Sequence, residues 1–397
     1  MCKLGYMDYI AGTYRKYYAN TSGEYEYFLP SYLPKTFVAN DPKINRLLEE
    51  ATHSLGELNA YARFVPDIDY FIRMHETKEA TASSKIEGTR TNMGEALLSE
   101  KDVAPEKRDD WREVQNYIQA MKFAISNLES LPLISRLLSE THKLLLSGVR
   151  GAGKQPGMIR SSQNWIGGAT LRDAKFIPPH NVHVGELLSD LERYVNQDNM
   201  TTPVLVKAAF AHYQFESIHP YLDGNGRLGR LLIILYLMQE KMLDKPVLYL
   251  SQFFELHRQD YYDSLTTVRR TNDFEQWLRF FLVGVNETSK KAIATLQAIM
   301  HLRTQTNQDI LQLGKRAERA HQLIEHLYQH PIVSVAQVAE FLRVTPQAAN
   351  SLVGELVRIG VLREITGYER NRLFRYEAYV ALFGDGDKDK GEVVDEQ

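Results

Sequence analysis

Residues 215–230 read Phe-Glu-Ser-Ile-His-Pro-Tyr-Leu-Asp-Gly-Asn-Gly-Arg-Leu-Gly-Arg, and the sequence after them is strongly apolar. Pro220 disfavours helical backbone at His219, because the proline ring clashes with a helical residue before it. Gly224 and Gly226 allow the chain to turn tightly and to adopt positive φ. The stretch therefore predicts a loop that ends in the first turn of a buried helix.

This predicted helix start has the features of an anion-binding site. Backbone N–H groups point outward at a helix N-terminus, and the helix dipole favours negative charge there. The amides of Gly224, Asn225 and Gly226 can add an anion-binding concavity. Arg227 and Arg230 lie at i and i+3 on one helix face and have the forked geometry that suits phosphate. We therefore expect these five residues to bind phosphate groups.

Two further side chains of the loop can bind a cation and accept a proton. Asp223 stands at its mouth, and a carboxylate beside a polyphosphate implies a cation between them, which predicts Mg²⁺ at Asp223. His219 is a base at the edge of the same loop, and Gln214, one turn earlier, is expected to face the bound ligand. Each feature alone is typical of an ordinary turn or a solvated helix, but within so short a stretch they favour a phosphate site.

The run from His219 to Arg230 resembles the signature of the Fic-domain family of nucleotidyltransferases, His-Pro-Phe-x-Asp/Glu-Gly-Asn-Gly-Arg-x-x-Arg. Its departure is Tyr221 in place of phenylalanine, which keeps an apolar anchor. The resemblance implies a mainly α fold, with a Fic helical core and a small β-hairpin flap. It also implies a protein adenylyltransferase (AMPylator), which moves AMP from ATP to a tyrosine, serine or threonine hydroxyl of a target protein.

Size and composition set the class of protein. The 397 residues are 44% hydrophobic and 24% charged, with a net charge of −3, which is ordinary for a globular protein without a global pull toward nucleic acid or membrane. The single cysteine, Cys2, excludes an internal disulfide. The start lacks a signal-peptide core, and the longest apolar run, 231–238, is too short to span a bilayer. We expect a cytoplasmic homodimer that does not bind membranes.

The N-terminal residues 1–36 are rich in tyrosine and contain prolines that break regular structure. We expect an irregular arm whose rings pack on the next domain. Exposed tyrosines in this arm are an alternative set of self-modification targets, namely Tyr14, Tyr17, Tyr18, Tyr25 and Tyr27.

A helical pattern begins near Asp41 and a second begins after Asp67. On the second helix, Ser83 and Glu87 lie four residues apart on one face, and Gly88 can end the helix. A glutamate in the last turn opposes the helix dipole, so we expect a cationic partner for Glu87.

The motif Ser83-x-x-x-Glu87-Gly88 resembles the inhibitory motif of Fic proteins that carry it before the core. The surrounding residues 29–92 resemble the N-terminal module that often precedes Fic cores. The resemblance of the motif implies that Glu87 pairs with Arg230. An arginine held by a carboxylate cannot also hold a γ-phosphate, so Glu87 is expected to keep basal activity low.

Further helices are predicted over the remainder of residues 105–285. Residues 157–168 and 174–179 predict two short strands around a polar turn. The resemblance identifies this hairpin with the flap that holds a target segment by main-chain pairing, although a purely structural hairpin fits equally. It also implies that His257 contacts the adenine base, with a half-buried surface histidine as the alternative.

The C-terminal part, after a polar helix or connector, predicts three short helices and a hairpin that resemble a winged helix-turn-helix. The third helix starts at the cap Thr345 and Pro346. Its exposed side chains offer little positive charge, while the wing offers arginines; DNA binding and a docking or dimer role both stay open. These side chains are Gln347, Asn350, Ser351, Glu355 and Arg358 on the helix and Arg363, Arg370, Arg372 and Arg375 on the wing.

Together these patterns predict an order of domains. They are an N-terminal helical module (1–115), a Fic core (116–285), a helical linker (286–315), a winged-helix domain (316–382) and a disordered tail (383–397). Two other functions remain open: a transcription regulator whose Fic domain senses a nucleotide, and a de-AMPylase in which Glu87 aligns water.

Overall fold

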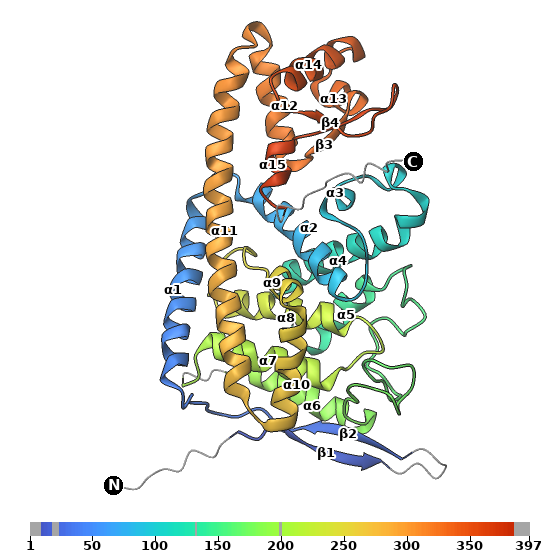
Figure 1. Cartoon of the computed structure of the whole chain (residues 1–397), viewed down its shortest axis with the longest axis vertical. Coiled ribbons are helices and arrows are strands. Elements are labelled where there is room, and N and C mark those ends of the chain that lie inside the picture. Colours follow the sequence, from blue (N-terminus) through green and yellow to red (C-terminus); the bar gives the residue numbers. More distant parts are fainter. Residues whose placement is uncertain (1–8, 18–23, 132, 198–200, 385–397) are drawn as a thin grey trace, which may run out of the picture. The chain divides into compact units, whose positions relative to one another are not determined.

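The structure is a computed structural model that describes residues 9–17, 24–131, 133–197 and 201–384 (Figure 1). The fold is mainly α with small antiparallel sheets, which confirms the fold class expected from the sequence. Packing divides the chain into two compact units. The first comprises Met1–Phe64, Glu79–Thr91 and Ala104–Ala292, and the second comprises Val65–Lys78, Asn92–Val103 and Ile293–Gln397. The domain boundaries expected from the sequence stay a prediction.

The first unit contains most of the helices. They are α1 (Pro42–Phe64), α4 (Arg108–Asn127), α5 (Ser135–Leu145), α6 (Val184–Asn196), α7 (Val204–Ile218), α8 (Asn225–Gln239), α9 (Ser251–Leu256) and α10 (Arg258–Thr271), with 3₁₀ turns η2 (Pro105–Lys107) and η3 (Asn181–His183). Two helices have residues in both units, α2 (Ile68–Ile86) and α11 (Phe274–Leu311). Residues 274–285 and 286–311, which the sequence divides between core and linker, form one continuous helix.

Helices α7 and α8 pack against each other and form the core of the first unit (Figure 1). Both are buried almost all round, which explains why their sequences lack a polar face. Their close approach depends on Gly229, because a Cβ there would overlap the Oε1 atom of Glu216 on α7. His212 on α7 donates from Nδ1 to the Gly229 carbonyl (2.7 Å), and its Nε2 accepts from the Tyr261 hydroxyl (2.8 Å). This core holds the loop between the two helices.

The N-terminal segment is a β-hairpin, so the expectation of an irregular arm is wrong. Strands β1 (Gly12–Tyr17) and β2 (Tyr25–Pro30) pair antiparallel. Their aromatic residues favour a pleated surface, and the prolines lie at or beyond the end of β2, where they do not interrupt pairing. Phe28 also donates its N–H to the Ile177 carbonyl (3.0 Å). Tyr14 is exposed and Tyr27 is buried, and Tyr18 lies outside the described residues.

The expected flap hairpin is reduced to a single antiparallel bridge between Ile166 and Phe176. The two strands predicted at residues 157–168 and 174–179 do not form as regular strands. Gly167 and Gly168 follow directly after the bridge with positive φ, which turns the chain out of the extended conformation. The segment is therefore a loop with one ladder position.

The second unit contains a winged helix-turn-helix, as predicted. A sheet of order β3-β5-β4 accompanies its helices. Ser334 forms a capping box with Gln337, and Thr345 caps the next helix ahead of Pro346, so local sequence determines both helix starts. The elements are α3 (Met93–Ala96), η1 (Glu100–Asp102), η4 (Gly314–Arg316), α12 (Ala317–Gln329), β3 (Ile332–Ser334), α13 (Val335–Leu342), α14 (Pro346–Arg358), β4 (Arg363–Glu364), β5 (Leu373–Arg375) and α15 (Glu377–Ala381).

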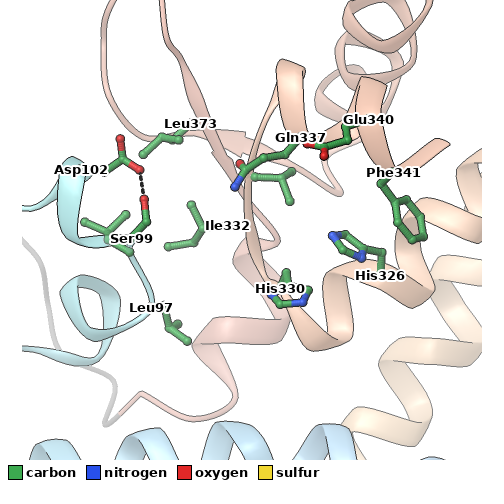
Figure 2. A pocket seen from close by; sticks show the side chains of 12 residues that line it. Leu97, Ser99, Asp102, His326, His330, Ile332, Gln337, Glu340, Phe341 and Leu373 are labelled. Atoms are coloured by element: carbon green, nitrogen blue, oxygen red, sulfur yellow. Dashed lines mark hydrogen bonds between the residues drawn. The ribbon is translucent and has the colours of Figure 1, made fainter. Parts of the chain in front are cut away.

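A cavity of about 530 Å³ lies within this second unit (Figure 2). Its wall combines the segment before and within η1 with α12, β3, α13 and β5. Burial lowers the pKa of His326 and His330, so both rings are neutral at neutral pH. The sequence analysis does not predict this cavity. Its lining includes Leu97, Ser99, Asp102, His326, His330, Ile332, Gln337, Glu340, Phe341 and Leu373.

Among the described residues, every helix is too short or too polar to span a lipid bilayer.

Candidate active site

The signature loop runs from the end of α7 to the start of α8. His219 ends α7 in a left-handed conformation (φ 49°, ψ 62°), and Gly224 precedes α8 with φ 75°. Asn225 closes the loop between them: its Oδ1 accepts from the Tyr221 N–H and its Nδ2 donates to the Tyr221 carbonyl, both at 2.8 Å. The side chain of Asn225 is thus engaged within the loop, and its backbone N–H is the group left to meet a phosphate.

Three side chains that the sequence analysis does not single out support this loop from outside. His142 on α5 donates from Nε2 to the Asp223 carbonyl (2.9 Å), and its ring stacks on Tyr221 at 4.0 Å. Arg160 and Asn164 both donate to the His219 carbonyl, at 2.9 and 3.3 Å. Each contact joins residues more than fifty positions apart, so no local sequence signal could have identified them.

The first turn of α8 lies among charged side chains. Arg227 is almost fully buried; its Nη1 lies 3.4 Å from Glu113 and its Nη2 lies 3.8 Å from Asp223. Glu113 also pairs with Arg150 at 3.3 Å. Burial raises the pKa of Glu113, while Arg227 and Arg150 act in the opposite direction. The sequence analysis missed Glu113 and Arg150, which form an ion-pair group around Arg227.

Arg230 is held by the end of α2. Its Nη2 donates to Glu87 Oε1 (2.8 Å) and to the Ser83 carbonyl (2.9 Å), and its Nε donates to Ser83 Oγ (2.9 Å). The Arg230 side chain is 1% exposed, against 32% for Glu87. Gly88 follows with φ 101°, as expected for the residue that ends this helix. The structure therefore contains the pair between Glu87 and Arg230 that the resemblance implies.

The Glu87 carboxylate also lies against the first turn of α8. A Cβ at Gly226 would overlap Glu87 Oε1 and would lie 3.0 Å from Arg230 Nη1. Burial would raise the pKa of Glu87, but the charge and hydrogen bond of Arg230 hold it below its usual value. For Arg230, burial lowers the pKa, and the charge of Glu87 outweighs it and raises the pKa. A negative group therefore already stands at the positive end of this helix.

His219 is a neutral base in this setting. Burial, aided by the charge of Arg160, lowers its pKa to about 3, so the imidazole is unprotonated at neutral pH. Its Nδ1 is buried and has no hydrogen-bond partner in the part of the chain that the structure describes. Neighbouring Glu216 is buried as well, and burial raises the pKa of this carboxyl to about 7. The loop thus combines an uncharged base with the two arginines of α8.

Two residues predicted to contact the nucleotide have other contacts. Gln214 is fully buried, and its Nε2 donates to the Ser31 carbonyl (2.9 Å). His257 lies between α9 and α10, with its ring 4.7 Å from that of Phe253 and its Nδ1 3.8 Å from Asp260. Their nucleotide roles stay predictions.

Asp223 is the predicted metal ligand, and its surroundings suit one. Its side chain is 37% exposed, so a carboxylate oxygen can reach a solvated ion. Oδ1 accepts from the Gly224 N–H at 2.6 Å. No group of three or more histidine, cysteine, aspartate or glutamate side chains that could hold a metal is found among the described residues. A lone carboxylate fits Mg²⁺ that takes its other ligands from water and substrate phosphates.

Family models match three parts of the chain. "Fic/DOC family N-terminal" matches residues 45–126, "Fic/DOC family" matches residues 132–237, and "HTH DNA binding domain" matches residues 321–375. The second match includes the loop described above, and the third covers the winged-helix elements.

Relatives and solved structures agree with these matches. Protein adenylyltransferase Fic of Drosophila erecta is 28% identical over 195 residues, 48% of this chain and 36% of the relative. Protein adenylyltransferase fic-1 of Caenorhabditis elegans is 27% identical over 279 residues, 68% of this chain and 49% of the relative. The chain thus spans about half or less of these relatives.

Two crystal structures share the fold. A Fic family protein from Desulfovibrio desulfuricans aligns over 87% of this chain and 98% of its own, with a TM-score of 0.54 and 21% identity. A Fic domain containing signaling protein from Bacteroides thetaiotaomicron aligns over 63% of this chain and 97% of its own, with a TM-score of 0.52 and 16% identity.

Proposed function

We propose that this chain, a member of the Fic/DOC family with a C-terminal helix-turn-helix domain, transfers AMP from ATP to a hydroxyl side chain of a protein. The observation that carries the proposal is the start of α8, where Arg230 donates to the Glu87 carboxylate and this carboxylate lies against Gly226 of the first turn, near the neutral imidazole of His219. A site that holds a carboxylate in this way has the charge and donors to hold a phosphate. The relatives named protein adenylyltransferase support the same activity.

His219 acts as the general base in this reaction. The acceptor hydroxyl gives its proton to the imidazole while its oxygen attacks the α-phosphorus of ATP. An oxygen–phosphorus bond forms, the bond between the α-phosphorus and the bridging oxygen breaks, and pyrophosphate leaves. A pKa of about 3 ensures that the ring is in its basic form before substrate binds. Phosphate charge close to the ring would raise this pKa and so strengthen the base.

The rest of the loop holds the phosphates in place. The amides of Gly224, Asn225 and Gly226 and the side chain of Arg227 contact the α- and β-phosphates, and Arg230 contacts the γ-phosphate. Asp223 would hold Mg²⁺, which when bound supplies neutralisation of phosphate charge. Most of the catalysis is thus positioning and electrostatic stabilisation, as is general for phosphoryl transfer.

Glu87 makes this site autoinhibited. Its carboxylate takes the Arg230 hydrogen bond that a γ-phosphate needs, and it repels a phosphate from the first turn of α8. If Glu87 moved away, Arg230 could donate to the γ-phosphate, and the first turn of α8 could bind phosphate without repulsion. The chain is then an enzyme with low basal activity that rises when α2 moves.

Transfer of labelled AMP tests this function. Purified protein with Glu87→Gly, incubated with Mg²⁺ and ATP labelled at the α-phosphate, should label itself or proteins of a lysate. The additional change His219→Ala should abolish labelling and leave ATP binding intact. Labelling that survives His219→Ala would refute the role of His219, and absence of labelling in the Glu87→Gly protein would refute the proposed activity. Loss of label from pre-modified protein would instead favour the reverse, de-AMPylating reaction.

DNA binding is a second candidate function, through the C-terminal domain. The match to an HTH DNA binding domain favours it. Arg372 of the wing donates to Asn350 on α14 at 3.2 Å, so these two exposed side chains lie on one face of the domain. However, Arg375 pairs with Glu377 (2.7 Å) and Arg358 with Glu355 (2.7 Å), which leaves less charge for phosphates.

We therefore expect weak DNA binding with a shallow salt dependence. An electrophoretic shift measured at increasing salt tests it. Binding that is unaffected by Asn350→Ala and Arg372→Ala would argue against contact through this face and leave a docking or dimer role. A nucleotide-sensing regulator would bind DNA differently with and without ATP. Cytoplasmic location and homodimeric assembly stay predictions of the sequence.

A further inference from the structure

Arg160 is a buried arginine in the loop that follows α5, and 2% of it is exposed. Its guanidinium donates only to backbone carbonyls in the described structure: His219 at 2.9 Å, Ser162 at 3.1 Å, Pro179 at 2.5 Å and Ile218 at 3.3 Å. These carbonyls come from the end of α7 and from both arms of the loop around the Ile166–Phe176 bridge. One side chain therefore joins the catalytic loop to the expected flap.

Burying a cation without a carboxylate partner costs free energy, which suggests that Arg160 has a role beyond packing. Burial lowers the pKa of Arg160 to about 10, so the side chain stays charged at neutral pH. A buried charge is normally paired with an opposite charge, because carbonyl dipoles alone compensate it less well. If Arg160 served only to fill space, methionine or leucine could do so without the free-energy cost of burying a charge.

The contacts of Arg160 converge on a strained residue. His219 has a left-handed backbone (φ 49°, ψ 62°), which costs a non-glycine residue free energy and persists only where its surroundings enforce it. Arg160 Nε and Asn164 Nδ2 both donate to its carbonyl, and the Arg160 N–H donates to the next carbonyl, of Pro220, at 2.9 Å. Asn164 also donates to the Tyr221 carbonyl at 2.9 Å. Three successive carbonyls are thus held from one side.

We propose that Arg160 is the positioning residue for His219: it holds the strained backbone so that the imidazole faces the reacting phosphate. This inference rests on the proposed function, because it names how the general base of that reaction is held. Arg160 touches no reacting atom itself. Its contacts with Ser162 and Pro179 also tie the orientation of the base to the placement of the flap.

Kinetics in the Glu87→Gly background test this inference. Arg160→Met removes the charge and all five N–H donors and keeps an unbranched, flexible side chain. We expect kcat to fall by about 10- to 100-fold, the range for a misplacement of about 1 Å, while KM for ATP stays within about twofold. We also expect the acid limb of the pH–rate profile to move to higher pH. Arg160→Lys keeps the charge and one set of donors and should recover part of kcat and the wild-type pH limb.

Two variants serve as controls. Arg136→Met removes the same charge from an exposed position on α5 and should change neither parameter. Asn164→Ala removes one donor to the His219 carbonyl without changing charge, so it should lower kcat several-fold and leave the pH limb in place. Asn164→Ala also keeps the test decisive if Arg160→Met does not fold.

An unchanged kcat in both Arg160→Met and Asn164→Ala would overturn the inference, as would a rise in KM for ATP with kcat unaltered. A second measurement does not depend on turnover. The imidazole resonances of His219, assigned by their loss in His219→Ala, should shift in Arg160→Met and stay in place in Arg136→Met. If the Glu87→Gly protein transfers no AMP, the proposed function fails, and these resonances still decide whether Arg160 positions the ring.

Discussion

Replacing Glu87 with alanine should lower the free energy of unfolding of the protein and, at the same time, raise its affinity for ATP. Arg230 is 1% exposed, so loss of Glu87 leaves a buried charge without the carboxylate that pairs with it. Removal of one member of a fully buried pair costs about 3–5 kcal/mol. Because Glu87 is 32% exposed and Arg230 keeps two bonds to Ser83, we expect a loss of only about 1–2 kcal/mol.

The gain appears when ATP binds. The freed guanidinium can form a charge-assisted hydrogen bond with the γ-phosphate, worth about 1.5–3 kcal/mol. The affinity for Mg-ATP should therefore rise by about 10- to 150-fold. Glu87→Gln, which keeps a hydrogen-bond acceptor but not the charge, should fall between wild type and alanine. Glu57→Ala on the exposed face of α1 provides a control that removes the same charge elsewhere.

Two measurements read these opposite changes. Tryptophan fluorescence during urea unfolding reports the first unit, since Trp111, Trp165 and Trp277 all lie in it. Titration calorimetry gives the dissociation constant for Mg-ATP. An unchanged affinity in a variant that is destabilised as expected would refute the competition between Glu87 and phosphate for Arg230.

Two other predictions concern the core beneath the site. Gly229→Ala should destabilise the first unit by about 1–3 kcal/mol through overlap with Glu216, whereas Gly56→Ala, where a Cβ meets nothing within 4 Å, should not destabilise it; equal urea midpoints for the two variants would contradict this packing. Burial lowers the pKa of His142 to about 4 and those of His212 and His219 to about 3, so below pH 6.5 the unfolded chain binds more protons than the folded chain at each of these histidines. Stability should then decrease as the pH falls, by about 1.4 kcal/mol per unit for each histidine. Glu216, with its pKa raised to about 7, opposes one of the three, so these four groups together should lower stability by about 2.8 kcal/mol per unit between pH 6.5 and pH 5; a urea midpoint that stays constant or rises on acidification would refute it.

How far the sequence predicts this site depends on the range of each interaction. The turn at His219, the start of α8 and the caps at Ser334 and Thr345 follow from residues within a few positions of one another, and the structure has all of them. Glu87 and Arg230 are 143 positions apart, so their pairing could be predicted only from the resemblance to a known motif.

Other features depend on contacts that no local pattern encodes. In the sequence, nothing distinguishes Arg160 from other loop residues or His142 from other helix residues. In the structure, each donates a hydrogen bond to a carbonyl of the signature loop. Asn225 combines both cases: its position in the motif predicts a backbone N–H for a phosphate, whereas the bonds of its side chain to Tyr221 are not predicted by the sequence. The β1–β2 hairpin differs from the expected irregular arm because the prolines lie at or beyond the end of β2, whereas the aromatic residues that favour strands lie within both strands.

The most direct test of the account is a crystal structure of the Glu87→Gly protein with Mg²⁺ and an ATP analogue that cannot be cleaved between the α- and β-phosphates. We expect the triphosphate at the first turn of α8 and the γ-phosphate on Arg230. The imidazole of His219 should lie close enough to the α-phosphorus that one acceptor oxygen can stand about 3–3.5 Å from both. A nucleotide bound elsewhere, or with its α-phosphorus shielded from His219, would contradict it.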